Sequence, residues 1–171
     1  MACLSKIGLA IEYDCQNGYA SIDSALIINR ADIESFGTLD FEINAINLRV
    51  GASAFKVDTV KKSVTAVETL RVNEGAPNAF HQEIKLTVYD KANTILANAL
   101  SNADAVVLYK TGNTYRAAGM RYGLKATASE YDAHSNGGWT TFTLSTPDNV
   151  VGEIRLSVSA SVYNNLYSTA M

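Results

Sequence analysis

Apolar and polar residues alternate along much of the chain, most clearly between residues 62 and 89. A period of two places apolar side chains on one face of a β-strand and polar side chains on the other. The turn-forming run Gly75-Ala76-Pro77-Asn78 divides this region into two halves. The pattern therefore predicts a β-hairpin over about residues 61–89, with arms of about a dozen residues, roughly twice the usual strand length.

The two faces of this predicted hairpin differ in character. Its apolar face carries Val64, Ala66, Leu70, Val72, Ile84, Leu86 and Val88. Its polar face carries Thr65, Thr69, Arg71, Asn73, Glu83, Lys85 and Thr87. Two residues break the alternation, because Val67 falls on the polar face and Glu68 on the apolar one. We expect the apolar face to be buried and the polar face to meet water.

Further strands are predicted by short apolar or alternating runs bounded by turn residues, at 25–28, 41–45, 105–109, 115–118, 122–131, 140–144 and 154–162. In the second of these, Phe41, Ile43 and Ala45 alternate with polar residues. Helical spacing of apolar residues predicts one substantial α-helix over about residues 90–101, with Asp90 as its N-cap. A short terminal helix is expected over 163–170.

Strands outnumber helices and do not alternate regularly with them, which favours a mainly β fold, an antiparallel β-sandwich or small barrel, over an α/β fold. A chain of 171 residues fits one domain. We therefore expect a single structural domain over 1–171, with an N-terminal arm at about 1–24 and a C-terminal elaboration at about 163–171.

Composition narrows the function classes. Hydrophobic residues make up 47% and charged residues 18% of the chain, as in a globular protein. The net charge of −3 disfavours a surface built to neutralise nucleic-acid phosphates. We see neither a secretory signal pattern nor an apolar run long enough to span a bilayer, so we expect a protein made in the cytoplasm.

The sequence carries no recognisable catalytic or metal-binding motif. Cys3 and Cys15 lack nearby Cys or His partners for zinc, and either a reduced pair or a disulfide remains open. His134 lies beside Asp132 and Ser135, but adjacent loop residues do not build a catalytic triad unaided. The carboxylates Glu68, Glu74 and Glu83 are more simply solvated strand residues than a glycosidase pair. We expect no enzyme activity, metal or cofactor.

The order of elements from Phe80 to Glu153 carries a family resemblance. The motifs are Ala105-Val106-Val107-Leu108-Tyr109, Gly112-Asn113-Thr114-Tyr115-Arg116, Tyr122-Gly123-Leu124 and Trp139-Thr140-Thr141-Phe142-Thr143-Leu144. With the N-terminal Met-Ala-Cys and a second cysteine after Asp14, they resemble tail-tube-like structural proteins of tailed phages that infect Bacteroidetes-type bacteria. The resemblance covers somewhat less than half of the chain.

That resemblance implies a virion subunit that assembles with itself into hexameric rings, which stack into a hollow tail tube. The polar hairpin face, with the seven residues named above, would then line the channel through which DNA passes without specific binding. The sequence leaves the sign of the channel charge open, because Arg71 and Lys85 lie beside Glu83. Other tail proteins of the virion are implied as partners.

Two other readings stay open. A capsid decoration or head–tail connector protein would share the strand content and the assembly but not the stacking. A carbohydrate-binding β-sandwich would use an aromatic platform of Tyr115, Tyr131 and Trp139, although aromatic residues are also ordinary strand and interface residues.

Overall fold

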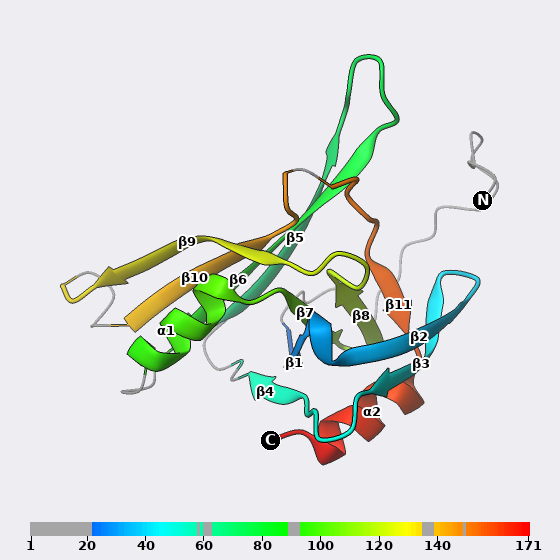
Figure 1. Cartoon of the computed structure of the whole chain (residues 1–171), viewed down its shortest axis with the longest axis horizontal. Coiled ribbons are helices and arrows are strands. Elements are labelled where there is room, and N and C mark those ends of the chain that lie inside the picture. The colour runs from blue at the N-terminus through cyan, green and yellow to red at the C-terminus, as the bar shows by residue number, and fades with distance from the viewer. Residues whose placement is uncertain (1–21, 58, 60–62, 89–92, 135–138, 149) are drawn as a thin grey trace.

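The computed structural model describes residues 22–57, 59, 63–88, 93–134, 139–148 and 150–171. Some residues of the sequence analysis lie outside the described residues: both cysteines, the predicted cap Asp90, Ser135, and residues 61, 62 and 89 at the two chain ends of the predicted hairpin. The described part consists of two β-sheets and two α-helices, and the mainly β sandwich is confirmed (Figure 1). The described sheets do not close, so the barrel alternative is wrong.

The larger sheet has seven strands in the order β2-β3-β11-β8-β7-β1-β4. Their bounds are β1 Ser24–Asn29, β2 Ile33–Leu39, β3 Glu42–Leu48, β4 Phe55–Val57, β7 Ala105–Thr111, β8 Thr114–Ala118 and β11 Leu156–Val158. A 3-10 turn, η2 Arg30–Asp32, joins β1 to β2. Residues 105–108 of the central strand β7 are all buried, because layers cover both faces of the sheet there.

The smaller sheet has four antiparallel strands in the order β5-β6-β10-β9. They are β5 Val64–Arg71, β6 Ala79–Val88, β9 Lys125–Asp132 and β10 Trp139–Ser145. The predicted hairpin is thus present, but its strands are shorter than expected, because pairing stops at Arg71 and Ala79 and an exposed loop follows. The helix α1, Asn93–Asn102, confirms the predicted helix and packs against β9.

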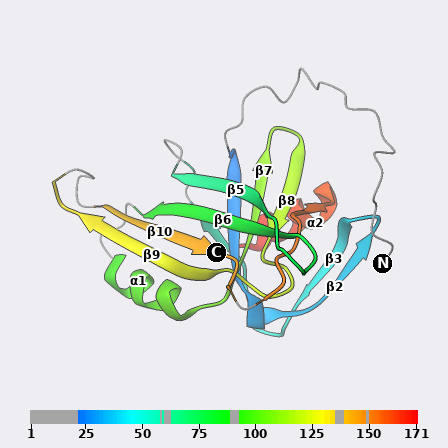
Figure 2. The ribbon, with the colours of Figure 1, turned by 90° about the horizontal axis from the view of Figure 1, so that it is seen from above.

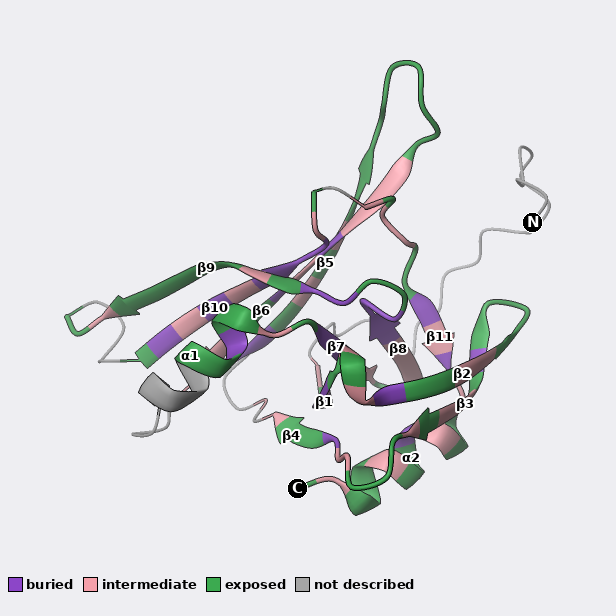
Figure 3. Ribbon diagram, in the orientation of Figure 1, coloured by how far each residue is buried: buried purple, intermediate pink, exposed green. Residues whose placement is uncertain are grey.

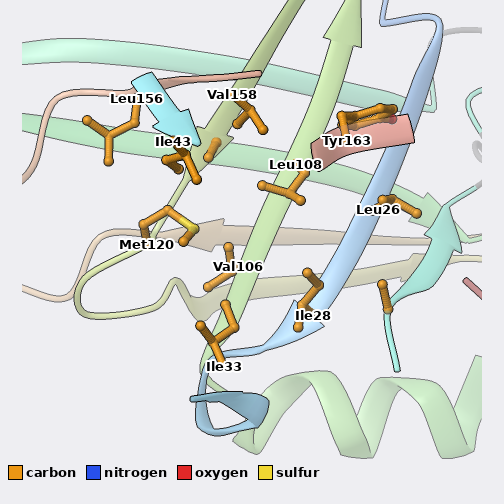
Figure 4. Packing of buried hydrophobic residues seen from close by; sticks show 12 residues of the cluster. Leu26, Ile28, Ile33, Ile43, Val106, Leu108, Met120, Leu156, Val158 and Tyr163 are labelled. Atoms are coloured by element: carbon orange, nitrogen blue, oxygen red, sulfur yellow. The ribbon is translucent and has the colours of Figure 1, made fainter. Parts of the chain in front are cut away.

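Two hydrophobic clusters occupy the two sides of the seven-stranded sheet. One lies between the sheets and includes Val64, Ile84, Leu86, Val107 and Phe142. The other lies on the far side, where Figure 4 shows Leu26, Ile28, Ile43, Val106, Leu108, Met120 and Tyr163 converging from different elements. The molecule therefore has three layers: the four-stranded sheet, the seven-stranded sheet, and the C-terminal helix, which packs on the far side of the larger sheet beside β3 and β8 (Figures 1 and 2).

The C-terminal helix α2 is Ala160–Thr169, longer than predicted. Ser159 caps it by accepting the Val162 N–H at 3.4 Å. Its Tyr163 is buried and hydrogen-bonds to the Ser24 hydroxyl at 2.8 Å, and burial raises the Tyr163 pKa to about 12. The C-terminal residues are thus part of the core.

Two strand predictions need correction. The run 154–162 forms a strand only at Leu156–Val158, because the chain turns into α2 at Ala160. Phe41 does not lie in a strand; with Asp40 it forms the two-residue turn between β2 and β3, where φ is +49° at Asp40 and +65° at Phe41. No helix among the described residues is long and apolar enough to cross a membrane.

Candidate functional site

The predicted polar residues of the hairpin share one face of the four-stranded sheet. The register places Thr65 opposite Lys85, Thr69 opposite His81 and Arg71 opposite Ala79. Glu83 and Thr87 lie two residues before and after Lys85 along β6, on the same face. We call this surface the polar face; its opposite side packs into the core between the sheets.

Asn73 is the exception among the seven predicted residues. It follows β5 in the loop, where its Nδ2 donates to the Pro77 carbonyl at 3.1 Å. Its backbone N–H donates to the Asn78 side chain at 3.3 Å. Asn73 therefore shapes the end of the hairpin and does not lie on the strand face.

Two further residues of the hairpin belong to the polar face. Val67 lies opposite Glu83 and is half exposed, so an apolar side chain meets water on this otherwise polar face. His81 lies opposite Thr69, and its buried Nδ1 has no hydrogen-bond partner. The period of two had already placed Val67 on this face, and extending it back from Glu83 along β6 places His81 there too.

The polar face continues across β10 and β9, which hairpin reasoning alone did not reach. Thr141 lies opposite Thr87, and their hydroxyls are 3.3 Å apart. Thr143 lies opposite Lys85 on β6. Glu130 on β9 lies opposite Thr141. The face is therefore a threonine-rich surface four strands wide.

The positive charges of the hairpin part of this face have acidic partners. Lys85 Nζ lies 3.5 Å from Glu83 Oε1, and Arg71 Nη1 lies 3.5 Å from Asp148 Oδ1. Both pairs are solvent-exposed, so they add little stability. They matter for the charge of the surface: a polyanion that approaches either cation also meets its carboxylate partner. Glu130 adds a further negative charge to this face.

The edge of this sheet at β5 is free of a neighbouring strand in the described part of the chain. The Thr87 N–H donates to the Ser63 carbonyl at 2.8 Å, which fixes the alternation of hydrogen-bonded pairs along the hairpin. From this alternation, backbone groups of Thr65, Val67 and Thr69 face β6. Those of Val64, Ala66, Glu68 and Leu70 face outward, along an edge able to accept another strand.

The end of the hairpin extends beyond the body of the molecule (Figures 1 and 3). Leu70 is 53% exposed and Val72 is 74% exposed, so the predicted apolar face is buried only in the part nearest the core. All residues from 71 to 78 are exposed. An isolated domain gains no core from this extension.

Glu68, which breaks the alternation on the apolar face, is explained by a long-range contact. Its Oε2 accepts the Arg155 N–H at 2.6 Å, and the Arg155 guanidinium pairs with its Oε1. Nearby, Gly152 lies so close to β6 that a Cβ there would collide with the Phe80 carbonyl oxygen. The segment 150–155 is therefore held against the base of the hairpin, and Glu68 is not a solvated residue as the sequence suggested.

The other candidates from the sequence do not come together. The Asp132 carboxylate accepts the His134 backbone N–H at 2.8 Å, a local turn contact that does not involve the imidazole. Glu68 and Glu83 lie on opposite faces of the hairpin. Among the described residues, no three His, Cys, Asp or Glu side chains are grouped so as to hold a metal ion.

The three aromatic residues proposed as a sugar platform are dispersed. Tyr115 on β8 packs against Tyr163, with ring centroids 5.0 Å apart, on the far side of the seven-stranded sheet. Tyr131 lies opposite Thr140 and Trp139 opposite Asp132, so these two residues point to opposite faces of the four-stranded sheet. No shared platform results.

Comparison with known proteins adds no family to this picture. No family model matches the chain, and neither a curated protein nor a solved structure matches it significantly.

Proposed function

We propose that this chain is a structural subunit of a phage virion that assembles with itself into rings, which stack into a tail tube. The observation that carries the proposal is the β5 edge, which no other described strand pairs, on a hairpin longer than its own core requires. Natural proteins usually cover, shorten or pair such an edge. A neighbouring copy pairs it here.

Ring closure follows from the two unlike edges of the four-stranded sheet. In the described part, β5 and β9 are its outer strands. Pairing the β5 edge of one copy with the β9 edge of the next is a heterologous contact, and such contacts close into rings when the rotation fits. A register shift interrupts the pairing of β9 with β10 at Thr143/Leu144, and such irregularities bend sheets. The family resemblance supplies six as the number of copies.

In such a ring the polar face lines the channel. The opposite face carries Ile84, Leu86 and Phe142, whose burial in the core excludes them from a wet lumen. Threonine hydroxyls bind water, and among the described residues of β5 and β6 the cations Lys85 and Arg71 are each paired with an acid, which weakens their hold on a DNA backbone. DNA would slide through without adhering, and no catalysis or cofactor is needed.

The test is electron microscopy and light scattering of the purified protein at increasing concentration. We expect rings and stacked tubes. Ala66→Pro is the matched variant, because the Ala66 N–H faces outward and its loss leaves the bonds between β5 and β6 in place. It should stay monomeric with an unchanged circular dichroism spectrum.

Three outcomes would count against the proposal. Wild-type protein that remains monomeric at high concentration would refute assembly. Ala66→Pro protein that assembles as wild type does would refute the β5 edge as the contact. Rings that never stack would instead support a connector or capsid decoration protein.

A further inference from the structure

The segment 150–155 crosses from the smaller sheet to the larger one and lies against the base of the projecting hairpin (Figure 1). It leads into β11, and its Gly152 packs on the backbone of Phe80 in β6. The side chains of Val151 and Ile154 are 70% and 44% exposed, so apolar burial contributes little to holding this segment. We call residues 150–155 the strap.

Two carboxylates hold the strap in place. The first belongs to the hairpin: Glu68 on β5 accepts the Arg155 N–H through Oε2 at 2.6 Å, and its Oε1 pairs with the Arg155 guanidinium. The second belongs to the strap itself: Glu153 Oε1 accepts the Arg121 N–H at 2.9 Å. Arg121 lies in the connection between β8 and β9, which is another crossing between the two sheets. The strap therefore ties the hairpin to the body of the protein through polar contacts.

The second of these anchors is a poor environment for a negative charge. The Glu153 side chain is only 10% exposed, and among the described residues its Oε2 has no hydrogen-bond partner. Arg121 Nε lies 3.8 Å from this oxygen, which is too far for a hydrogen bond, and the Arg121 side chain is half exposed.

Two positive charges act on Glu153 within the described part of the chain, and neither compensates for its burial. One is Arg121; the other is Arg30 in η2, whose Nε donates to the Arg121 carbonyl at 3.2 Å. Burial has the largest effect and raises the pKa of Glu153 above its ordinary value of 4.5, against the opposing effects of the two arginines and of the Arg121 and Met120 N–H groups.

We propose that the strap is a pH-sensitive clasp, which holds the base of the hairpin against the body of the protein and loosens when Glu153 ionises. When the strap is open, Glu153 meets water and regains its ordinary pKa of 4.5. The closed strap favours the protonated carboxyl, so this part of its stability is complete below pH 4.5 and is lost as the pH rises through the pKa of the closed state. The clasp works within a single chain, so it goes beyond the assembly proposed above and does not depend on it.

The test is residue-resolved amide hydrogen exchange on dilute protein, with each rate divided by the intrinsic rate at the same pH. The amides of Arg121 and Arg155 report on the two anchors, because each donates to one of the two carboxylates. As the pH rises from 4.5, the protection of both amides should fall. It should fall below that of Leu108, whose strand β7 is paired on both sides and opens only when the whole chain unfolds.

Three variants make the test specific. Glu153→Gln keeps an oxygen that accepts the Arg121 N–H but cannot ionise, so the protection of the two strap amides should become independent of pH. Asp148→Asn is the matched control, because it removes an exposed carboxylate from the same connection, and it should keep the wild-type pH dependence. Glu68→Gln weakens the other anchor, so it should lower the protection of both amides at every pH.

Three results would overturn the proposal. The first is wild-type protection of Arg121 and Arg155 that does not change with pH. The second is an unchanged pH dependence in Glu153→Gln. The third is protection of both amides equal to that of Leu108 at every pH, because the strap would then open only with the whole chain. All three leave the rings untouched, which Ala66→Pro tests separately.

Discussion

Two neighbouring residues of β6 provide a direct test of which face of the hairpin is buried. Leu86 is 3% exposed and lies between Val64 on β5 and Phe142 on β10. Both neighbours are buried, so the cavity left by Leu86→Ala has little room to collapse, and we expect a loss of about 3 kcal/mol. Thr87→Ala removes only the contact with the Thr141 hydroxyl, so its cost should be at most about 1 kcal/mol.

Urea denaturation followed by circular dichroism measures the difference, at a concentration low enough to keep the protein monomeric. A gap of about 2 kcal/mol is roughly a thirtyfold change in the folding equilibrium. Aspartate should widen it, because Leu86→Asp buries a charge and prevents folding, whereas Thr87→Asp changes only the polar face. If Thr87→Ala cost as much as Leu86→Ala, the assignment of the two faces would be wrong.

Three further predictions concern contacts away from this pair. Burial raises the pKa of the Glu153 carboxyl above its ordinary value of 4.5, against the opposing effect of Arg121. Protonation of Glu153 therefore stabilises the folded state; this stability is fully present below pH 4.5 and is lost as the pH rises through the folded pKa. Glu153→Gln should therefore be more stable than wild type at neutral pH in urea titrations, with the gap closing on acidification; a gap independent of pH would contradict this. Tyr163→Phe should cost about 1 kcal/mol in the same assay, and wild type alone should lose stability between the ordinary pKa of 10.0 and the folded value of about 12. Glu68→Gln should speed tryptic cleavage after Arg155, followed by mass spectrometry, because it weakens the pair that holds this segment; an unchanged rate would show that other contacts hold it.

Local alternation was sufficient to predict much of the candidate site. The residues Thr65, Thr69, Glu83, Lys85 and Thr87 were assigned to one strand face from the sequence, and the register places them there. The period of two is a local property of the backbone, so it needs no knowledge of the rest of the fold.

The parts that the sequence did not predict depend on distant contacts. Thr141 and Thr143 join the polar face only because β10 pairs with β6, more than fifty residues away in the chain. Glu68 looked like a solvated residue until Arg155 was seen to pair with it. The apolar character of Phe41 fitted a strand pattern, but Leu39 pairs with Glu42, which places Phe41 in the turn between β2 and β3.

The central claim, that the β5 edge is an assembly surface, is tested most directly by residue-resolved amide hydrogen exchange on dilute and assembled protein. In dilute protein, Thr65, Val67 and Thr69 should already be protected by β6, whereas Val64, Ala66, Glu68 and Leu70 should exchange quickly. Assembly should protect the second set. Fast exchange of those four amides in the assembled protein would contradict the account.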